Sequence, residues 1–194
     1  MDVTDGLLEP HTLRPSTRSR IGLSMEPVEI RSALPDELAK VLEVTRAAYD
    51  EYSQLMPPKW WEMYLDNIVQ TVEGTDLERC IVATRGRDVV GSVYLFPADA
   101  PVYGADPVAE SYPEVRLLAV PPAERGNGIG GALMEECKLR ARNMGASWLG
   151  LHTTEVMQSA RRMYERMGFV RVPESDFRPA PNWVVMGFKL DLTR

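Results

Sequence analysis

Four glycines lie within positions 126–131 and form a glycine turn, the part of the sequence best suited to chemistry. They follow an apolar run that ends at Val120 and precede Leu133, Met134 and Cys137, which have the spacing of a buried helical face. Glycine lets the backbone approach an anion closely, and the unpaired N–H groups of a helix start point toward it along the helix dipole. A strand, a glycine turn and a helix in this order therefore predict an anion-binding site. An ordinary tight turn is the alternative.

The glycines also match a dinucleotide fingerprint, G-x-G-x-x-G, at Gly126, Gly128 and Gly131. In the dinucleotide fold the strand runs almost directly into the first glycine, whereas here five residues, two of them prolines, separate Val120 from the turn. Only 39 residues follow Glu155, the candidate ribose-binding acid, so the second half of that fold has no room. No Lys-Ser/Thr pair follows the glycines, which excludes a P-loop.

Hydrophobic periodicity places the glycine turn within an ordered series of elements. Strands are expected over residues 28–31, 79–84, 89–96, 114–120, 147–153, 169–172 and 182–190, and helices over 35–49, 59–72, 128–143 and 156–167. Four prolines make residues 97–113 a loop. This order predicts one α/β domain over residues 25–194 with a mixed sheet of six or seven strands. Residues 1–24 lack periodicity and are expected to be a flexible leader.

The composition limits the kinds of protein and partner. The chain has 194 residues, 44% of them hydrophobic, and a net charge of −6, as in a soluble domain. It has no apolar run long enough for a membrane span and no secretory signal, so a cytoplasmic location is expected. With two histidines and two isolated cysteines, no metal-binding spacing exists, and we interpret Cys80 and Cys137 as buried reduced thiols. Net acidity argues against nucleic acid as a partner.

Charge is unevenly distributed along the chain. Residues 36–114 carry 6 basic and 15 acidic side chains, a sum of −9, whereas residues 115–194 carry 12 basic and 8 acidic ones, a sum of +4. The basic part contains the glycine turn and therefore suits a phosphorylated ligand, whereas the acidic part suits a cationic one.

Two segments together resemble the GNAT superfamily of acetyl-CoA-dependent N-acetyltransferases. The family's Gln/Arg-x-x-Gly-x-Gly/Ala element matches residues 125–130, and its helix signature Ala-x-x-x-Tyr-x-x-x-Gly-Phe matches Ala160, Tyr164, Gly168 and Phe169. Both occur in the family's order and spacing, and the expected elements fit the family over about residues 26–191. The resemblance implies a mostly antiparallel sheet with about four helices, and acetyl-CoA as co-substrate without a metal.

The resemblance also implies a set of cofactor contacts. The pyrophosphate of coenzyme A would lie on the backbone N–H groups of the turn, and the pantetheine arm would pair with the preceding strand where it splays from its neighbour. These contacts involve Leu118, Ala119, Val120, Arg125, Gly126, Asn127, Gly128, Ile129, Gly130 and Gly131. The family's usual Asn, seven residues before the helix tyrosine, is replaced by Met157, whose thioether cannot make the amide's contact; Ser159 would partly compensate.

Transfer to an amine also needs a group that protonates the leaving thiolate and one that takes a proton from the amine. The resemblance implies that Tyr164 is the acid, and a buried tyrosine that only packs is the alternative. For the base, Glu114 lies where some members carry a glutamate, and His152 lies on the next strand, where others carry a carboxylate. The alternatives are a solvated glutamate, a satisfied core histidine, and an ordered water that takes the proton.

The acceptor would be bound by the first two helices, the loop before Glu114 and the turn between the last strands. Their acids and aromatic residues predict a wall suited to a cationic primary amine on a small molecule or a peptide. The aromatic residues are Tyr49, Tyr52, Trp60, Trp61, Tyr64, Tyr103 and Tyr112. A solvated acidic face and a core tryptophan pair are the alternative.

Two other functions and one assembly state follow from the same features. A coenzyme A-binding sensor would keep the glycine turn without turnover. A dinucleotide-dependent oxidoreductase would rest on the glycine fingerprint alone. The exposed loops and the last strand would support a homodimer, as in many members of the family.

Overall fold

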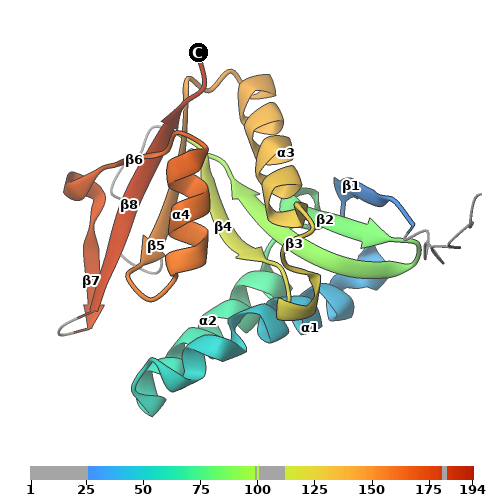
Figure 1. Cartoon of the computed structure of the whole chain (residues 1–194), viewed down its shortest axis with the longest axis horizontal. Coiled ribbons are helices and arrows are strands. Elements are labelled where there is room, and N and C mark those ends of the chain that lie inside the picture. Colours follow the sequence, from blue (N-terminus) through green and yellow to red (C-terminus); the bar gives the residue numbers. More distant parts are fainter. Residues whose placement is uncertain (1–25, 99, 101–111, 181–182) are drawn as a thin grey trace, which may run out of the picture.

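The computed structural model describes residues 26–98, 100, 112–180 and 183–194 (Figure 1). The strands are β1 (Val28–Ser32), β2 (Cys80–Arg85), β3 (Asp88–Phe96), β4 (Glu114–Ala119), β5 (Trp148–Thr154), β6 (Val170–Arg171), β7 (Phe177–Ala180) and β8 (Trp183–Asp191). The helices are α1 (Leu38–Tyr49), α2 (Pro58–Gly74), α3 (Ile129–Asn143) and α4 (Gln158–Arg166). The predicted leader, residues 1–24, and most of the predicted loop, residues 97–113, lie outside the described residues.

Within the described residues the strands form one eight-stranded sheet in the order β1-β2-β3-β4-β5-β8-β6, with β7 paired to β8. Every pairing is antiparallel except the parallel one between β4 and β5. The predicted fold class, a mixed and mostly antiparallel sheet with about four helices, is confirmed. The additional strand is β7, which contains Pro179; proline lacks the N–H group for a ladder and is therefore confined to edge strands such as this one.

The two faces of the sheet carry separate hydrophobic cores. Helices α3 and α4 cover one face, and α1 and α2 cover the other (Figure 1). Successive residues of β2 alternate between the cores, with Ile81 and Ala83 in the first and Cys80 and Val82 in the second. Because both faces are buried, these strands appear in the sequence as continuous apolar runs.

The two cysteines belong to different cores. Cys80 lies on the α1–α2 side and Cys137 lies on α3, and both are free and buried. Burial raises the pKa of Cys80 to about 11 and that of Cys137 to about 12. The interpretation of both residues as buried reduced thiols is confirmed.

Helix α2 has 17 residues and supplies one wall of the site. It begins at Pro58, whose fixed φ suits the first helical position. Ile68 and Val72 are its fully buried residues and pack in the core beneath the sheet. In the part of the chain that the structure describes, no helix is both long and apolar enough to cross a bilayer.

Candidate functional site

The glycine turn holds its backbone amides in an arrangement that suits an anion. Gly126 and Gly128 have φ of +82° and +78°, in the left-handed region that favours glycine. Gly128 is the N-cap of α3, and its carbonyl accepts the N–H of Ala132 at 3.0 Å. Among the described residues, none accepts a hydrogen bond from the N–H groups of residues 126–131. These amides are therefore available to a ligand at the positive end of the α3 dipole.

Arg125 fixes the glycine turn to the end of α1. Its guanidinium donates to the Ala48 carbonyl at 3.1 Å and to the Val120 carbonyl at 3.0 Å. It also forms a two-pronged ion pair with Glu51, with N–O distances of 2.7 and 3.0 Å. The hydrogen bond from Arg125 lowers the pKa of the Glu51 carboxyl. The side chain of Arg125 thus positions the turn, and Glu51 is a partner that sequence reasoning missed.

Strand β4 separates from β5 after two residue pairs. Its only partners on β5 are Gly150 for Glu114 and Leu151 for Val115. Beyond this point Leu117 has a φ of +49°, and the pairing of β4 with β3 is irregular. Residues 118–120 therefore present an edge without a β5 partner, as expected for the strand that splays from its neighbour.

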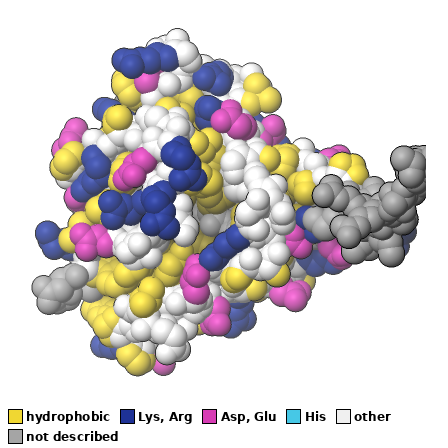
Figure 2. Space-filling view, in the orientation of Figure 1, with side chains coloured by type: hydrophobic (Ala, Val, Ile, Leu, Met, Phe, Trp, Pro, Cys, Tyr) yellow, Lys and Arg dark blue, Asp and Glu magenta, His cyan; other side chains and the backbone are white. Residues whose placement is uncertain are grey.

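A cavity of about 630 Å³ connects the glycine turn, the open edge of β4, α4 and the walls formed by α1–α2 and β7–β8. In Figure 2, arginine and lysine side chains gather over α4, and hydrophobic side chains gather between α2 and the end of β7. All predicted cofactor residues line the cavity except two. Ala119 is buried in the core, and Asn127 donates its amide to the Glu124 carbonyl at 3.2 Å.

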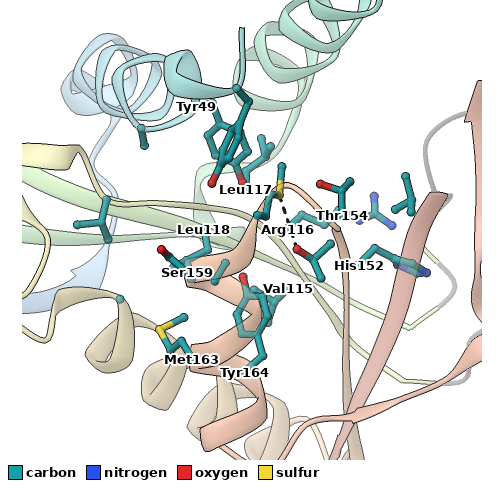
Figure 3. Close-up of a pocket in the computed structure, with 18 of the residues that line it drawn as sticks. Tyr49, Val115, Arg116, Leu117, Leu118, His152, Thr154, Ser159, Met163 and Tyr164 are labelled. Carbon is teal, nitrogen blue, oxygen red and sulfur yellow. Dashed lines mark hydrogen bonds between the residues drawn. The ribbon is translucent and has the colours of Figure 1, made fainter. Parts of the chain in front are cut away.

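Tyr164 projects from α4 into this cavity, and its hydroxyl points toward Val115 and Leu118 of β4 (Figure 3). The residue is only 6% exposed, and its ring packs against the Phe169 ring with the two centroids 5.8 Å apart. Ser159, in the first turn of the same helix, is exposed at the cavity wall. Met157 is buried, and its sulfur accepts a hydrogen bond from the Thr153 hydroxyl at 3.6 Å.

The two predicted bases contact each other. His152 Nδ1 lies 2.6 Å from Glu114 Oε1, and His152 Nε2 lies 3.0 Å from the Ser175 carbonyl oxygen. A carbonyl only accepts, and an ionised carboxylate only accepts, so both contacts are hydrogen bonds when each ring nitrogen of His152 carries a proton. Glu114 Oε2 also accepts from Arg116 Nε at 2.6 Å. Sequence reasoning missed Arg116, although alternation along a strand places residues 114 and 116 on one face.

This buried network leaves Glu114 a weak proton acceptor. Burial by itself raises the pKa of Glu114, but the hydrogen bonds and charges of His152 and Arg116 outweigh it and lower the pKa overall. Glu114 lies outside the described lining of the cavity, whereas His152 and Arg116 belong to the lining. Figure 3 shows the His152 and Arg116 side chains directed away from Tyr164. Glu114 therefore contacts both Arg116 and His152, and His152 also contacts the Ser175 carbonyl.

The described residues contain no group of three or more His, Cys, Asp or Glu side chains arranged to hold a metal ion. The described lining of the cavity supplies backbone amides, hydroxyl groups and guanidinium groups in place of metal ligands. Such groups suit phosphate and thioester ligands.

Sequence and structure comparisons show which known proteins the chain resembles. Residues 76–171 match the family described as "Acetyltransferase (GNAT) domain". Human N-acetyltransferase 8B is 29% identical, over 63% of this chain and 58% of that protein, and the mouse "Probable N-acetyltransferase family 8 member 5" is 33% identical, over 54% and 44%. The chain thus spans about half the length of these curated relatives. The PaiA N-acetyltransferase of Thermoplasma acidophilum, solved in complex with coenzyme A, shares the fold with a TM-score of 0.60 at 18% identity, covering 84% of this chain and 99% of that one.

Proposed function

The chain belongs to the GNAT superfamily, and we propose that it is an N-acetyltransferase that moves the acetyl group of acetyl-CoA to the primary amine of an acceptor bound in the same cavity. The proposal depends on one arrangement of three features in the cavity. Available amides lie at one end, the open edge of β4 lies in the middle, and the Tyr164 hydroxyl lies beside that edge. The names of the matched relatives, which are N-acetyltransferases, support it.

The residues present fit the phosphorylated part of coenzyme A. A pyrophosphate needs several converging donors at a solvent-accessible place, and the amides of residues 126–131 meet both conditions. Gly130 lies beside α4, where a Cβ atom would be in ordinary van der Waals contact with Met163 Sδ at 3.4 Å. Arg166 of the same helix also lines the cavity and adds a positive charge to its wall.

The open edge of β4 fits the pantetheine arm. An extended chain with amide groups can add to an unpaired strand edge through main-chain hydrogen bonds. Residues 118–120 form such an edge between the glycine turn and Tyr164. Bound there, the arm would run from the phosphate site toward the phenol, and an N–H of the edge would polarise the acetyl carbonyl.

In the proposed reaction the amine nitrogen forms a C–N bond to the acetyl carbon as the C–S bond of the thioester breaks. Acetyl-CoA supplies the activated acetyl group, and coenzyme A leaves as the thiol. We propose that Tyr164 donates the proton that the sulfur receives, because its phenol is buried, lines the cavity and points to the β4 edge. Solvent then returns this proton to the tyrosine.

We propose that water takes the proton lost by the attacking ammonium group. Arg116 and His152 lower the pKa of Glu114, and both ring nitrogens of His152 already lie within hydrogen-bonding distance of other groups. Neither side chain therefore offers a good lone pair to the amine. The rate should accordingly rise with pH in parallel with deprotonation of the acceptor amine itself.

Calorimetric titration with acetyl-CoA, NAD and FAD, followed by detection of released thiol with a panel of amines, tests the function. We expect acetyl-CoA to bind and the two dinucleotides not to bind. Failure of acetyl-CoA to bind would refute the proposal. Binding without thiol release from any amine would indicate a coenzyme A sensor in place of an enzyme.

A matched pair of glycine variants tests the anion site itself. Gly128 and Gly145 have φ of +78° and +79°, and a Cβ atom at either would meet nothing within 4 Å. Alanine in this conformation costs about 1 to 2 kcal/mol, so Gly128→Ala and Gly145→Ala should lower the melting temperature alike. Only Gly128→Ala should weaken acetyl-CoA binding, by roughly 10-fold, the value of one charge-assisted hydrogen bond. Equal affinities in the two variants would count against the glycine turn as the phosphate site.

A further inference from the structure

The cavity continues beyond Tyr164 into a part that the cofactor contacts do not use. One side of this part is formed by α1, α2 and the short 3-10 helix between them, residues 50–54. Its lining side chains are aromatic rings and thioethers: Tyr49, Tyr52, Met56, Trp60, Met63 and Tyr64. Tyr49 packs against Tyr52 and against Tyr64, with ring centroids 5.9 Å apart in each pair. The three tyrosine rings therefore support one another.

The opposite side comes from β7 and β8 and is also apolar. It contributes Phe177, Pro179, Trp183 and Val185 to the lining. Phe177 packs edge-on against the His152 ring, with centroids 5.3 Å apart, and His152 is tied to the neighbouring Ser175 carbonyl. Figure 2 shows hydrophobic side chains gathered at the surface between α2 and the end of β7. Two ordered apolar walls thus face each other across the space left for the acceptor.

Carboxylates are rare in the described lining. Glu124 belongs to it, but Glu124 lies next to the glycine turn and pairs with Arg85 at 2.9 Å. Glu62 and Asp66 of α2 are close to Trp60 in the sequence. Both are exposed, and neither belongs to the lining. The acidic half of the predicted acceptor wall is therefore not found among the described lining residues.

The aromatic half of the predicted wall is found in part. Tyr49, Tyr52, Trp60 and Tyr64 line the cavity, whereas Trp61 packs in the core. Tyr112 lies over Gly150, and Tyr103 lies outside the described residues.

We propose that the acceptor is a primary amine carried on a large apolar group, preferably an aromatic ring, and that polycationic amines are poor acceptors. This proposal rests on the proposed acetyl transfer. An aromatic or alkyl group enters the space between α1–α2 and β7–β8, and its amino group lies at the inner end, beside the β4 edge. A second ammonium group would lose its hydration among rings and thioethers without gaining a counter-charge from the described lining.

The test compares three amines at one pH: phenethylamine, hexylamine and cadaverine. Hexylamine and cadaverine have the same number of heavy atoms and differ in the second ammonium group. The readout is kcat/KM for thiol release by the full chain with saturating acetyl-CoA. We expect phenethylamine to exceed cadaverine by about 10- to 100-fold, the value of burying one apolar side group. Cadaverine equal to or better than hexylamine would overturn the proposal.

A pair of glutamate variants tests the position of the apolar wall. Met63 on α2 and Leu139 on α3 are 53% and 52% exposed, but only Met63 lines the cavity. Met63→Glu should raise kcat/KM for cadaverine relative to hexylamine by about two- to five-fold, the value of a partly exposed ion pair. Leu139→Glu should leave the ratio unchanged. The same change in both variants, or in neither, would show that the acceptor does not reach this wall.

Acetyl-CoA binding measured without any amine separates the two proposals. If acetyl-CoA does not bind, the transferase function fails. If it binds and cadaverine is preferred, only the acceptor class is wrong. If no amine is turned over, calorimetric titration of phenethylamine and cadaverine into the protein saturated with coenzyme A decides the acceptor class in the same way.

Discussion

Replacing Glu114 with glutamine removes the negative charge that faces the buried side chains of Arg116 and His152. Glu114 accepts from Arg116 Nε and from His152 Nδ1, each at 2.6 Å. The side chains of all three residues are less than one-tenth exposed, at 9%, 8% and 7%. Glutamine keeps the shape of the carboxyl group, so the variant changes charge and hydrogen bonding with little change in packing.

The cost of this change follows from the charge left behind. Removing one partner of a buried ion pair costs about 3 to 5 kcal/mol. We expect about 3 kcal/mol, because a neutral His152 can accept a hydrogen bond from the new amide, whereas Arg116 keeps its charge. For a chain of this size, a loss of that order lowers Tm by about 6 to 12 °C.

The loss should depend on pH with a definite sign. The pKa of Glu114 is lowered in the folded state from its ordinary value of 4.5. Its contribution to the free energy of unfolding is therefore complete above the unfolded pKa and disappears as pH falls through the lower folded value. The stability difference between the wild type and Glu114→Gln should accordingly be full at neutral pH and shrink in acid.

Urea unfolding followed by circular dichroism at neutral and acidic pH measures this difference. Glu135→Gln is the control, since Glu135 pairs with Lys138 at 2.8 Å but is 62% exposed, and such pairs contribute about 1 kcal/mol or less. Thiol release per folded molecule is measured on the same samples and should stay within a few-fold of the wild type. A rate lower by about 100-fold or more with unchanged stability would refute this reasoning and identify Glu114 as a general base.

Two further outcomes are expected. Tyr164→Phe should lower kcat by about 100-fold or more while leaving the acetyl-CoA dissociation constant unchanged, because the phenol acts on the leaving sulfur; thiol release and calorimetry measure the two quantities, and an unchanged kcat would remove Tyr164 from the mechanism. Cys80 and Cys137 should not react with Ellman's reagent until urea unfolds the chain, because both are buried and their pKa values are about 11 and about 12; rapid reaction of the native protein would contradict the two-core packing.

Local sequence patterns were sufficient for the elements and for the glycine turn. The turn depends on residues within one short segment, so composition and order alone predict its chemistry. The bounds of β2, β3 and α3 follow from apolar runs and helical spacing for the same reason. Strand β7 was missed because it is short, contains Pro179 and is defined by its pairing with β8, which no local pattern shows.

The contact between Glu114 and His152 required information that a single sequence lacks. The two residues are 38 positions apart, and each was a separate candidate for the base. The parallel register pairs Glu114 with Gly150, and His152 lies two residues further along β5 on the same face. Only this register shows that the candidates neutralise each other, which is why sequence reasoning treated them as rivals.

For α2 the acceptor wall was predicted too broadly, because the acids and aromatic residues of this helix were considered together. Trp60, Met63, Tyr64 and Asn67 recur at helical spacing and all line the cavity. Glu62 and Asp66 lie between them in sequence but on another face, in solvent. Separating the helix faces would have shown that the stripe directed at the site is aromatic and that the acids belong to the surface.

The acidic and basic segments of the chain form ion pairs with each other inside the molecule. Glu51 and Glu114 come from the acidic segment, residues 36–114, and their partners Arg125 and Arg116 come from the basic one. The first pair fastens the glycine turn to α1, and the second, together with His152, links β4 to Ser175, just before β7. These ion pairs therefore help to shape the walls of the cavity. We therefore expect charge selectivity to follow the described lining side chains, so that an apolar amine is preferred to a polycation even though residues 36–114 carry a sum of −9.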